Sequence, residues 1–200
     1  DSVASRGLGD VYKRQPEGPF FLDVGFVETH RGQFPQRHPE EDPRYLRPPP
    51  GLADLPATRD DVALFNSAAR LLDQGVGCVL DALADTGLDR HTLVICTTDH
   101  GISFPRHKCT LFDGGLEVML MLRGPATAAV PGGLPHGTAC DALVSQIDLF
   151  PTLCRYLGLT SPAWLQGVDL LPVLNGETSR VRDEIFGEIN YHAAYPVSYT

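Results

Sequence analysis

Residues 58–87 carry the strongest periodic pattern in this 200-residue chain. Thr58 and Asp61 form a start that is similar to a capping box, and Gly87 stands where a left-handed C-cap is expected. Apolar side chains recur between them at steps of three and four, which is the spacing of an amphipathic helix. They are Val62, Phe65, Ala69, Leu72, Val76, Val79 and Leu83. The pattern predicts one long helix with a single buried face.

Apolar runs rich in β-branched and aromatic residues lie on both sides of that predicted helix. Residues 19–27 and 92–98 are predicted strands, and residues 117–122 are a third. A strand, a helix and a strand in succession are typical of a largely parallel sheet covered by helices. The expected fold class is therefore α/β.

The other segments are shorter or irregular. Residues 32–56 hold seven prolines and predict a long surface loop. Residues 148–157 predict a short helix that tolerates Pro151 in its first turn and that Gly158 ends. Residues 166–176 are rich in turn formers, and residues 183–190 alternate between apolar and polar side chains, which predicts a strand. Residues 126–137 predict a loop.

Composition narrows the class of protein. Lys and Arg total 16 against 25 Asp and Glu, so the net charge is −9 at pH 7. This acidic balance argues against nucleic acid as a partner, because nucleic-acid binders carry basic patches. No apolar run approaches the ~20 residues that a membrane-spanning helix needs. The five cysteines show neither a CxxC pair nor zinc spacing.

Both ends of the chain lack the features of folded sequence. Residues 1–15 show no apolar periodicity, and residues 197–200 end without a cap or a turn. We interpret both as non-native scar sequence, with disordered native termini as the alternative. Residues 16–196 are then expected to be an internal piece of a longer protein. The cellular compartment stays unknown, with a periplasmic or secreted location left open.

Polar residues follow two of the predicted strands. Asp99, His100 and Gly101 come directly after the strand at 92–98, where α/β sheets place their ligands. A carboxylate and an imidazole there can share a metal ion; oxygen ligands suit Ca²⁺, and an imidazole shifts the preference toward Mn²⁺, Fe²⁺ or Zn²⁺. Lys108 suits an anionic substrate such as sulfate or phosphate. His30 follows the strand at 19–27.

Taken singly, each feature also fits an ordinary surface. Asp-His-Gly is compatible with an Asx turn that carries an exposed histidine. An isolated histidine such as His30 can be structural, and Arg106 with Lys108 can form a solvated face.

Taken in order, these features resemble the sulfatase family of the alkaline-phosphatase-like superfamily. The resemblance covers nearly all of residues 16–196, and its order and spacing are specific. ETHRGQFP, DHGISFPRHKCTLFDGG and RDEIFGEINYHAAYP look most like the branch that includes heparan N-sulfatases, arylsulfatase-type enzymes and their bacterial relatives. The other matching segments are PFFLDVGFVETHR, LLDQGVGCVLDALADTGLDRHTLVICTTDHG, KCTLFDGGLEVMLMLRGP, SQIDLFPTLCRYLGL and LQGVDLLPVL.

The resemblance implies a fold and its division. Residues 16–160 are expected to form the C-terminal part of a sulfatase-type αβα sandwich with a largely parallel central sheet. Residues 161–196 are expected to form a linker and the start of a small C-terminal α+β subdomain. The missing strands would leave sheet edges exposed, so the isolated chain is predicted to fold poorly.

The resemblance also implies roles for four residues. Asp99 matches the metal-binding aspartate of the family, and His100 occupies the next ligand position, where many sulfatases have Asn. The family's ion is Ca²⁺; the imidazole of His100 makes Mn²⁺ or another transition metal an alternative. Lys108 matches the residue that holds the sulfate oxygens, and His30 matches the active-site histidine near the sulfate or the leaving group. Their neighbours Arg31 and His107 receive no role.

The family nucleophile is formylglycine, made from the first residue of a Cys/Ser-x-Pro-x-Arg motif. No cysteine here has that context, and the family's N-terminal aspartate pair is absent, so both are expected upstream of this chain. We therefore predict a fragment of a metal-dependent sulfuric ester hydrolase that acts on sulfate esters or N-sulfates, inactive by itself. Its expected substrate is a sulfated small molecule or glycan. The alternatives are a phosphonate or phosphodiester hydrolase of the superfamily, or a non-catalytic fragment.

Overall fold

The computed structural model describes residues 18–125, 134 and 137–189. Its contacts divide the chain into two compact units. Unit 1 comprises Asp1–Leu88 and Asp99–Val118, and unit 2 comprises Asp89–Thr98 and Met119–Thr200. The predicted scar segments 1–15 and 197–200, and nearly all of the predicted loop 126–137, lie outside the described residues. Within the described part, none of the helices combines the length and apolarity needed to span a bilayer.

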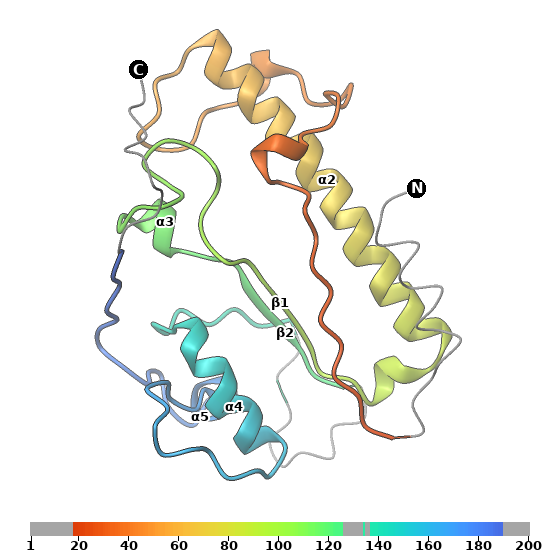
Figure 1. Cartoon of the computed structure of the whole chain (residues 1–200), viewed down its shortest axis with the longest axis vertical. Coiled ribbons are helices and arrows are strands. Elements are labelled where there is room, and N and C mark those ends of the chain that lie inside the picture. Colours follow the sequence, from red (N-terminus) through yellow and green to blue (C-terminus); the bar gives the residue numbers. More distant parts are fainter. Residues whose placement is uncertain (1–17, 126–133, 135–136, 190–200) are drawn as a thin grey trace. The chain divides into compact units, whose positions relative to one another are not determined.

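Helix α2 (Pro56–Asp85) is the longest element of unit 1 (Figure 1). It confirms the helix predicted from the apolar periodicity. The start predicted at Thr58 is wrong by two residues, because Pro56 occupies the first helical turn, where its fixed φ favours the helix and its missing N–H costs nothing. At the other end, Gly87 has a φ of +70°, which confirms the predicted left-handed cap.

Three aromatic rings join α2 to the rest of unit 1. The ring of Phe65 meets Phe34 at 6.2 Å and Phe104 at 5.7 Å between centroids, both edge-on. Phe104 is only 4% exposed. Edge-to-face pairs of this kind stabilise a core beyond the burial of their area. Phe65 of α2 thus packs against two segments, at Phe34 and Phe104, that lie 70 residues apart in sequence.

The predicted strand at residues 19–27 is wrong. The segment has no regular structure, and no strand pairs with it in the part of the chain that the structure describes. Phe21 is 89% exposed. Phe26 does pack on α2, because a Cβ added at Gly75 would lie 2.7 Å from its ring. The apolar pattern suits a buried strand, but a strand forms only where a partner offers backbone hydrogen bonds.

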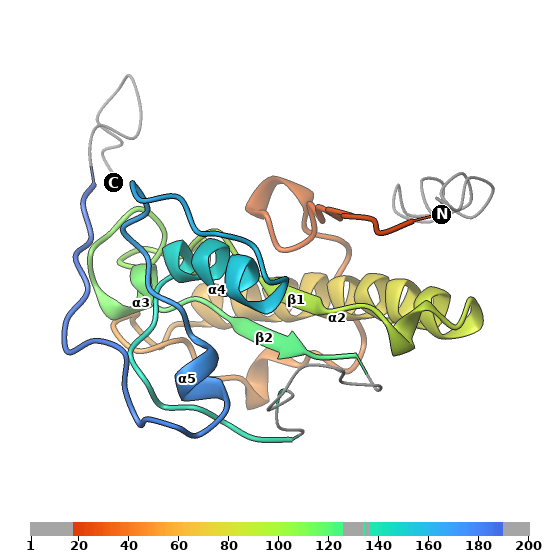
Figure 2. The same ribbon diagram turned by 90° about the horizontal axis from the view of Figure 1, so that it is seen from below.

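Unit 2 contains a two-stranded sheet of β1 (Val94–Thr97) and β2 (Leu120–Arg123), seen from another side in Figure 2. Both strands confirm predicted ones to within a few residues. Val94 pairs with Arg123 and Thr97 with Leu120, so the two strands run antiparallel. Sheets of α/β proteins that are mostly parallel commonly carry one antiparallel strand.

The rest of unit 2 is built around a buried carboxylate. Helix α4 (Leu149–Tyr156) confirms the predicted short helix, with Pro151 in its first turn, and a second, single-turn helix α5 (Leu171–Leu174) follows. Asp148 precedes α4 and is fully buried. It accepts the backbone N–H groups of Ser145 and Val168, both at 2.8 Å, and pairs with the guanidinium of Arg182.

The predicted strand at residues 183–190 is wrong as well. Its described part, residues 183–189, has no regular structure. Ile185 and Ile189, the apolar side of the alternation, are 37% and 42% exposed, so this segment has no buried face. As at residues 19–27, the side-chain pattern alone cannot supply a neighbouring strand.

Candidate active site

The structure brings Asp99 and His100 together at the start of the segment 99–118 of unit 1. Asp99 Oδ2 lies 3.2 Å from His100 Nε2, and Asp99 Oδ1 accepts the backbone N–H of His100 at 3.1 Å. His100 Nδ1 lies 2.7 Å from the carbonyl oxygen of Gly101. The Asp99 side chain is 84% exposed. The Asp99 carboxylate is therefore accessible to a metal ion from solvent.

The hydrogen bonds of His100 indicate which kind of ligand the Asp99–His100 pair can bind. A carbonyl oxygen only accepts, so Nδ1 must carry the proton that it shares with Gly101, and Nε2 of a neutral ring is then an acceptor. Nε2 and the Asp99 carboxylate then face each other 3.2 Å apart as two acceptors, so a cation placed between them would contact both. One carboxylate and one imidazole are chemically suited to a divalent ion.

Asp99 and His100 supply only part of a metal site. In the ranges that the structure describes, no three residues among His, Cys, Asp and Glu form a group able to hold a metal ion. Structural and catalytic ions commonly take at least three protein ligands. The pair would therefore need further ligands, and carbonyl oxygens, water or side chains beyond the described residues are chemically able to supply them.

Lys108 lies on the same segment, further along. Its backbone N–H donates to the carbonyl of Ile102 at 3.0 Å, so the chain folds back toward Asp99 and His100. Its side chain is half-buried, and no ion pair or hydrogen bond of its ammonium is found among the residues described. The chain has only one other lysine, Lys13. An unpaired ammonium in this position suits an anionic group.

The segment between Gly101 and Gly115 is tightly built. Gly101 donates its N–H to the carbonyl of Gly115 at 3.1 Å, and a Cβ at Gly101 would lie 1.7 Å from the Gly114 carbonyl oxygen. Only glycine permits so close an approach. Arg106 and Cys109, which flank His107 and Lys108, have φ of +67° and +63°. Such left-handed residues mark a backbone that its surroundings hold in place.

His30 lies in a second tight turn, at the start of the 3₁₀ turn η1 (Arg31–Gln33). Its N–H donates to the carbonyl of Val27 at 3.1 Å, and its side chain is exposed. Thr29 before it has a φ of +77°, which is rare for a β-branched residue. In the described part of the chain, no hydrogen bond or ion pair joins the His30 imidazole to Asp99, His100 or Lys108.

Arg31, to which the sequence analysis gives no role, connects the two turns. Its Nε donates to the Ser103 carbonyl at 3.0 Å, and its Nη1 pairs with Asp61 of α2 at 2.7 Å. The guanidinium carbon lies 5.0 Å from the ring centroid of Phe104. The partners lie 72 and 30 positions away in sequence, so no local pattern could have revealed them.

The long loop at residues 32–56 is irregular, as predicted, and is anchored on α2. Glu41 is 7% exposed and accepts hydrogen bonds from Arg70 Nε at 2.6 Å and Asn66 Nδ2 at 3.0 Å. The hydrogen bond from Arg70, followed by that from Asn66, lowers the pKa of Glu41. His38 adds a backbone bond of 2.8 Å to the Ser67 hydroxyl. The loop is thus held at one side of the helix.

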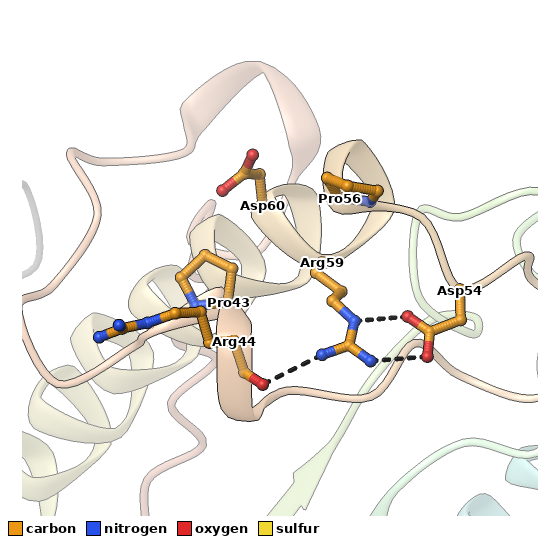
Figure 3. Close-up of a pocket in the computed structure, with 6 residues that line it drawn as sticks. All are labelled: Pro43, Arg44, Asp54, Pro56, Arg59 and Asp60. Carbon is orange, nitrogen blue, oxygen red and sulfur yellow. Dashed lines mark hydrogen bonds and ion pairs between the residues drawn. The ribbon is translucent and has the colours of Figure 1, made fainter.

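A cavity of about 480 Å³ lies where this loop meets the start of α2 (Figure 3). Arg59 donates from Nε and Nη2 to the two oxygens of Asp54 at 2.5 and 2.7 Å, and from Nη1 to the Arg44 carbonyl at 3.1 Å. None of the four predicted site residues lines it. The residues that do are Pro43, Arg44, Asp54, Pro56, Arg59 and Asp60.

Comparison with known protein families matches the sulfatase family over residues 4–159. The chain belongs to the sulfatase family. It is 30% identical over 218 residues to human N-sulphoglucosamine sulphohydrolase, covering 92% of this chain and 42% of that protein. It is 31% identical over 196 residues to human arylsulfatase A, covering 92% and 33%. With canine N-acetylgalactosamine-6-sulfatase the identity is 35% over 184 residues, covering 84% and 31%.

Comparison of this sulfatase-family chain with solved structures supports the α/β fold expected from its sequence. It superposes with a TM-score of 0.58 on the phosphonate monoester hydrolase SpPMH from Silicibacter pomeroyi, at 21% identity, covering 88% of this chain and 42% of that one. The predicted α/β fold class and family resemblance are thus confirmed. The chain spans less than half the length of each of these relatives. In general, the family implies a divalent metal ion and formylglycine.

Proposed function

We propose that the protein containing this chain is a metal-dependent sulfatase that hydrolyses sulfate esters or N-sulfates. The proposal is supported by membership of the sulfatase family and by relatives whose names denote sulfatases and a sulphohydrolase. Its substrate class is a sulfated small molecule or a sulfated glycan. Residues 16–160 would belong to the catalytic domain, and residues 161–196 would lead into a smaller subdomain.

The observation that carries the proposal is the segment 99–118. It presents a facing carboxylate and imidazole at Asp99 and His100, and at Lys108 an ammonium for which the described residues supply no ion pair. Gly101 allows the backbone of this segment to approach that of Gly114 closely. Asp99 and His100 would hold the divalent ion, Ca²⁺ by family resemblance and Mn²⁺ as the alternative. Lys108 would bind the sulfate oxygens. A divalent ion, when bound, stabilises negative charge on those oxygens.

His30 would act near the bond that breaks. Its exposed imidazole is free to hydrogen-bond the bridging atom of the substrate, and a protonated imidazole can donate a proton to the departing alcohol or amine. The nucleophile, a formylglycine, would be supplied by residues outside this chain, since no cysteine or serine of the chain lies in a Cys/Ser-x-Pro-x-Arg context.

The test uses the full-length protein. Asp99→Asn should remove most of the bound divalent metal and lower the turnover of 4-nitrophenyl sulfate, because the amide lacks the charge that holds the ion. Asp81→Asn removes an exposed carboxylate from α2 and serves as the matched control. Full metal content and activity in Asp99→Asn would refute the assigned site, and a wild-type protein that releases no sulfate from any sulfated substrate would refute the function.

Phosphonate monoester hydrolysis is the second candidate, and His100 favours it. An imidazole beside the metal-binding carboxylate suits transition metals better than Ca²⁺. Turnover of 4-nitrophenyl sulfate and 4-nitrophenyl phenylphosphonate, measured on one preparation, separates the two. The sulfatase proposal expects the higher kcat/KM on the sulfate ester, and the opposite order would replace it.

A further inference from the structure

We propose that Arg31 is a positioning residue that sets the imidazole of His30 relative to the anion-binding segment around Lys108. The proposal rests on the proposed sulfatase function, to which it adds a residue that touches neither substrate nor metal. It is carried by four separate contacts of one guanidinium, all within unit 1.

The first contact joins Arg31 to the segment 99–118. Arg31 Nε donates to the carbonyl of Ser103 at 3.0 Å. Ser103 lies between His100 and Lys108 and beside Ile102, whose carbonyl accepts the Lys108 N–H. The side chain directly after His30 is therefore hydrogen-bonded to the backbone that carries the predicted metal and sulfate ligands.

The other three contacts fix the guanidinium itself. Nη1 of Arg31 pairs with Asp61 in the first turns of α2 at 2.7 Å. The guanidinium carbon lies 5.0 Å from the centroid of Phe104 and 5.7 Å from that of Phe34. A planar group with several donors can meet two acceptors and two ring faces at once, whereas a lysine ammonium on the same stem cannot.

This arrangement does more for geometry than for stability. The side chains of Arg31 and Asp61 are 44% and 30% exposed, and ion pairs with that much exposure contribute little to folding. The turn that they hold is nevertheless strained, since Thr29 occupies the left-handed region. Without Arg31, the His30 turn has lost its direct bond to the segment 99–118 and is free to relax.

The test compares Arg31→Ala with Arg37→Ala in the full-length protein. Arg37 lies in the adjoining loop 32–56 and pairs with Asp60 at 3.4 Å, and within the described residues no hydrogen bond or ion pair joins it to the segment 99–118. Arg31→Ala should lower kcat for 4-nitrophenyl sulfate about 100-fold, the loss expected from a misplacement of about 1 Å. KM, metal content and thermal midpoint should change little, and Arg37→Ala should match the wild type in all four.

Chemical rescue separates positioning from folding. The Arg31 side chain is partly exposed, so its deletion leaves a site open to solvent. Guanidinium at concentrations well below denaturing ones should restore part of the kcat of Arg31→Ala and should leave Arg37→Ala unchanged. If Arg31→Ala does not fold, Arg31→Lys decides: it keeps the charge but should still lose kcat.

Two results would overturn the inference. One is a kcat of Arg31→Ala, or of Arg31→Lys where alanine does not fold, that equals that of Arg37→Ala. The other is a loss of kcat that follows the thermal midpoint and that guanidinium does not restore. Both results leave an active wild-type sulfatase. A wild type without sulfatase activity refutes the proposed function instead, so the two failures are distinguishable.

Discussion

Replacing Gly101 by alanine tests whether the close-packed backbone of the segment 99–118 matters. The added Cβ would lie 1.7 Å from the carbonyl oxygen of Gly114 and 2.8 Å from its carbonyl carbon. Carbon and oxygen atoms rarely approach closer than ~3.3 Å. The backbone at Gly101 and the backbone at Gly114 must therefore separate by about 1.6 Å, and the 3.1 Å bond from Gly101 N–H to the Gly115 carbonyl is lost or strained.

Two terms add up in the expected loss of stability. Overpacking costs about 1–3 kcal/mol, and a lost backbone hydrogen bond costs about 1 kcal/mol. Gly101→Ala should therefore lower the free energy of unfolding by about 2–4 kcal/mol. Gly101 directly follows Asp99 and His100, so a displacement of this size should also lower kcat on a sulfate ester about 100-fold.

Urea unfolding and sulfate-ester turnover of the full-length protein measure both effects. Gly77→Ala is the matched control, because a Cβ at Gly77 meets nothing within 4 Å. Gly77 lies inside α2, where alanine should raise stability by about 1 kcal/mol and leave kcat unchanged. The reasoning is refuted if Gly101→Ala unfolds at the same urea concentration as the wild type and retains its turnover.

Three further changes have expected outcomes. Asp148→Ala should lower the free energy of unfolding by about 3–5 kcal/mol, because it leaves the largely buried guanidinium of Arg182 without its carboxylate partner. Asp183→Ala breaks an exposed ion pair and should change the free energy of unfolding by less than about 1 kcal/mol. Equal effects of the two substitutions in urea unfolding would contradict this. The hydrogen bond from Arg70 holds the pKa of Glu41 below its usual 4.5, so its contribution is complete above about pH 4.5 and is lost as the pH falls through the lowered value. The stability difference between wild type and Glu41→Gln should accordingly shrink from about pH 6 to about pH 3, and a constant difference would disprove the linkage. Lys108→Ala should weaken inhibition by inorganic sulfate about tenfold, and an unchanged inhibition constant would exclude this lysine from sulfate binding.

Local patterns predicted the elements whose stability is local. The apolar spacing of α2 and the glycine at its C-terminal end are visible in sequence, and the structure has both. The strands predicted at residues 19–27 and 183–190 failed for a common reason. Alternation or apolarity says which face of a strand would be buried, whereas a partner strand is a property of the rest of the fold.

The candidate site divides in the same way. Asp99 and His100 are adjacent in sequence, so their contact follows from one turn at the end of a strand. The role of Arg31 depends on Ser103 and Asp61, which only folding brings near it. Phe65 belongs to the predicted apolar face of α2, but no sequence pattern predicts that Phe34 and Phe104 pack against it, because both lie in irregular segments without periodicity.

Thr29, Arg106 and Cys109 all hold left-handed backbone next to, or one residue from, the proposed functional groups. Each such residue stores about 1–3 kcal/mol of strain, which glycine would release. Selection for heat resistance alone would therefore favour Thr29→Gly, Arg106→Gly and Cys109→Gly. The same substitutions would loosen the turns that present His30 and Lys108, so a stabilised variant obtained in this way should be a slower enzyme. Engineering for thermal tolerance should leave these three positions fixed and look for its gains on the exposed face of α2.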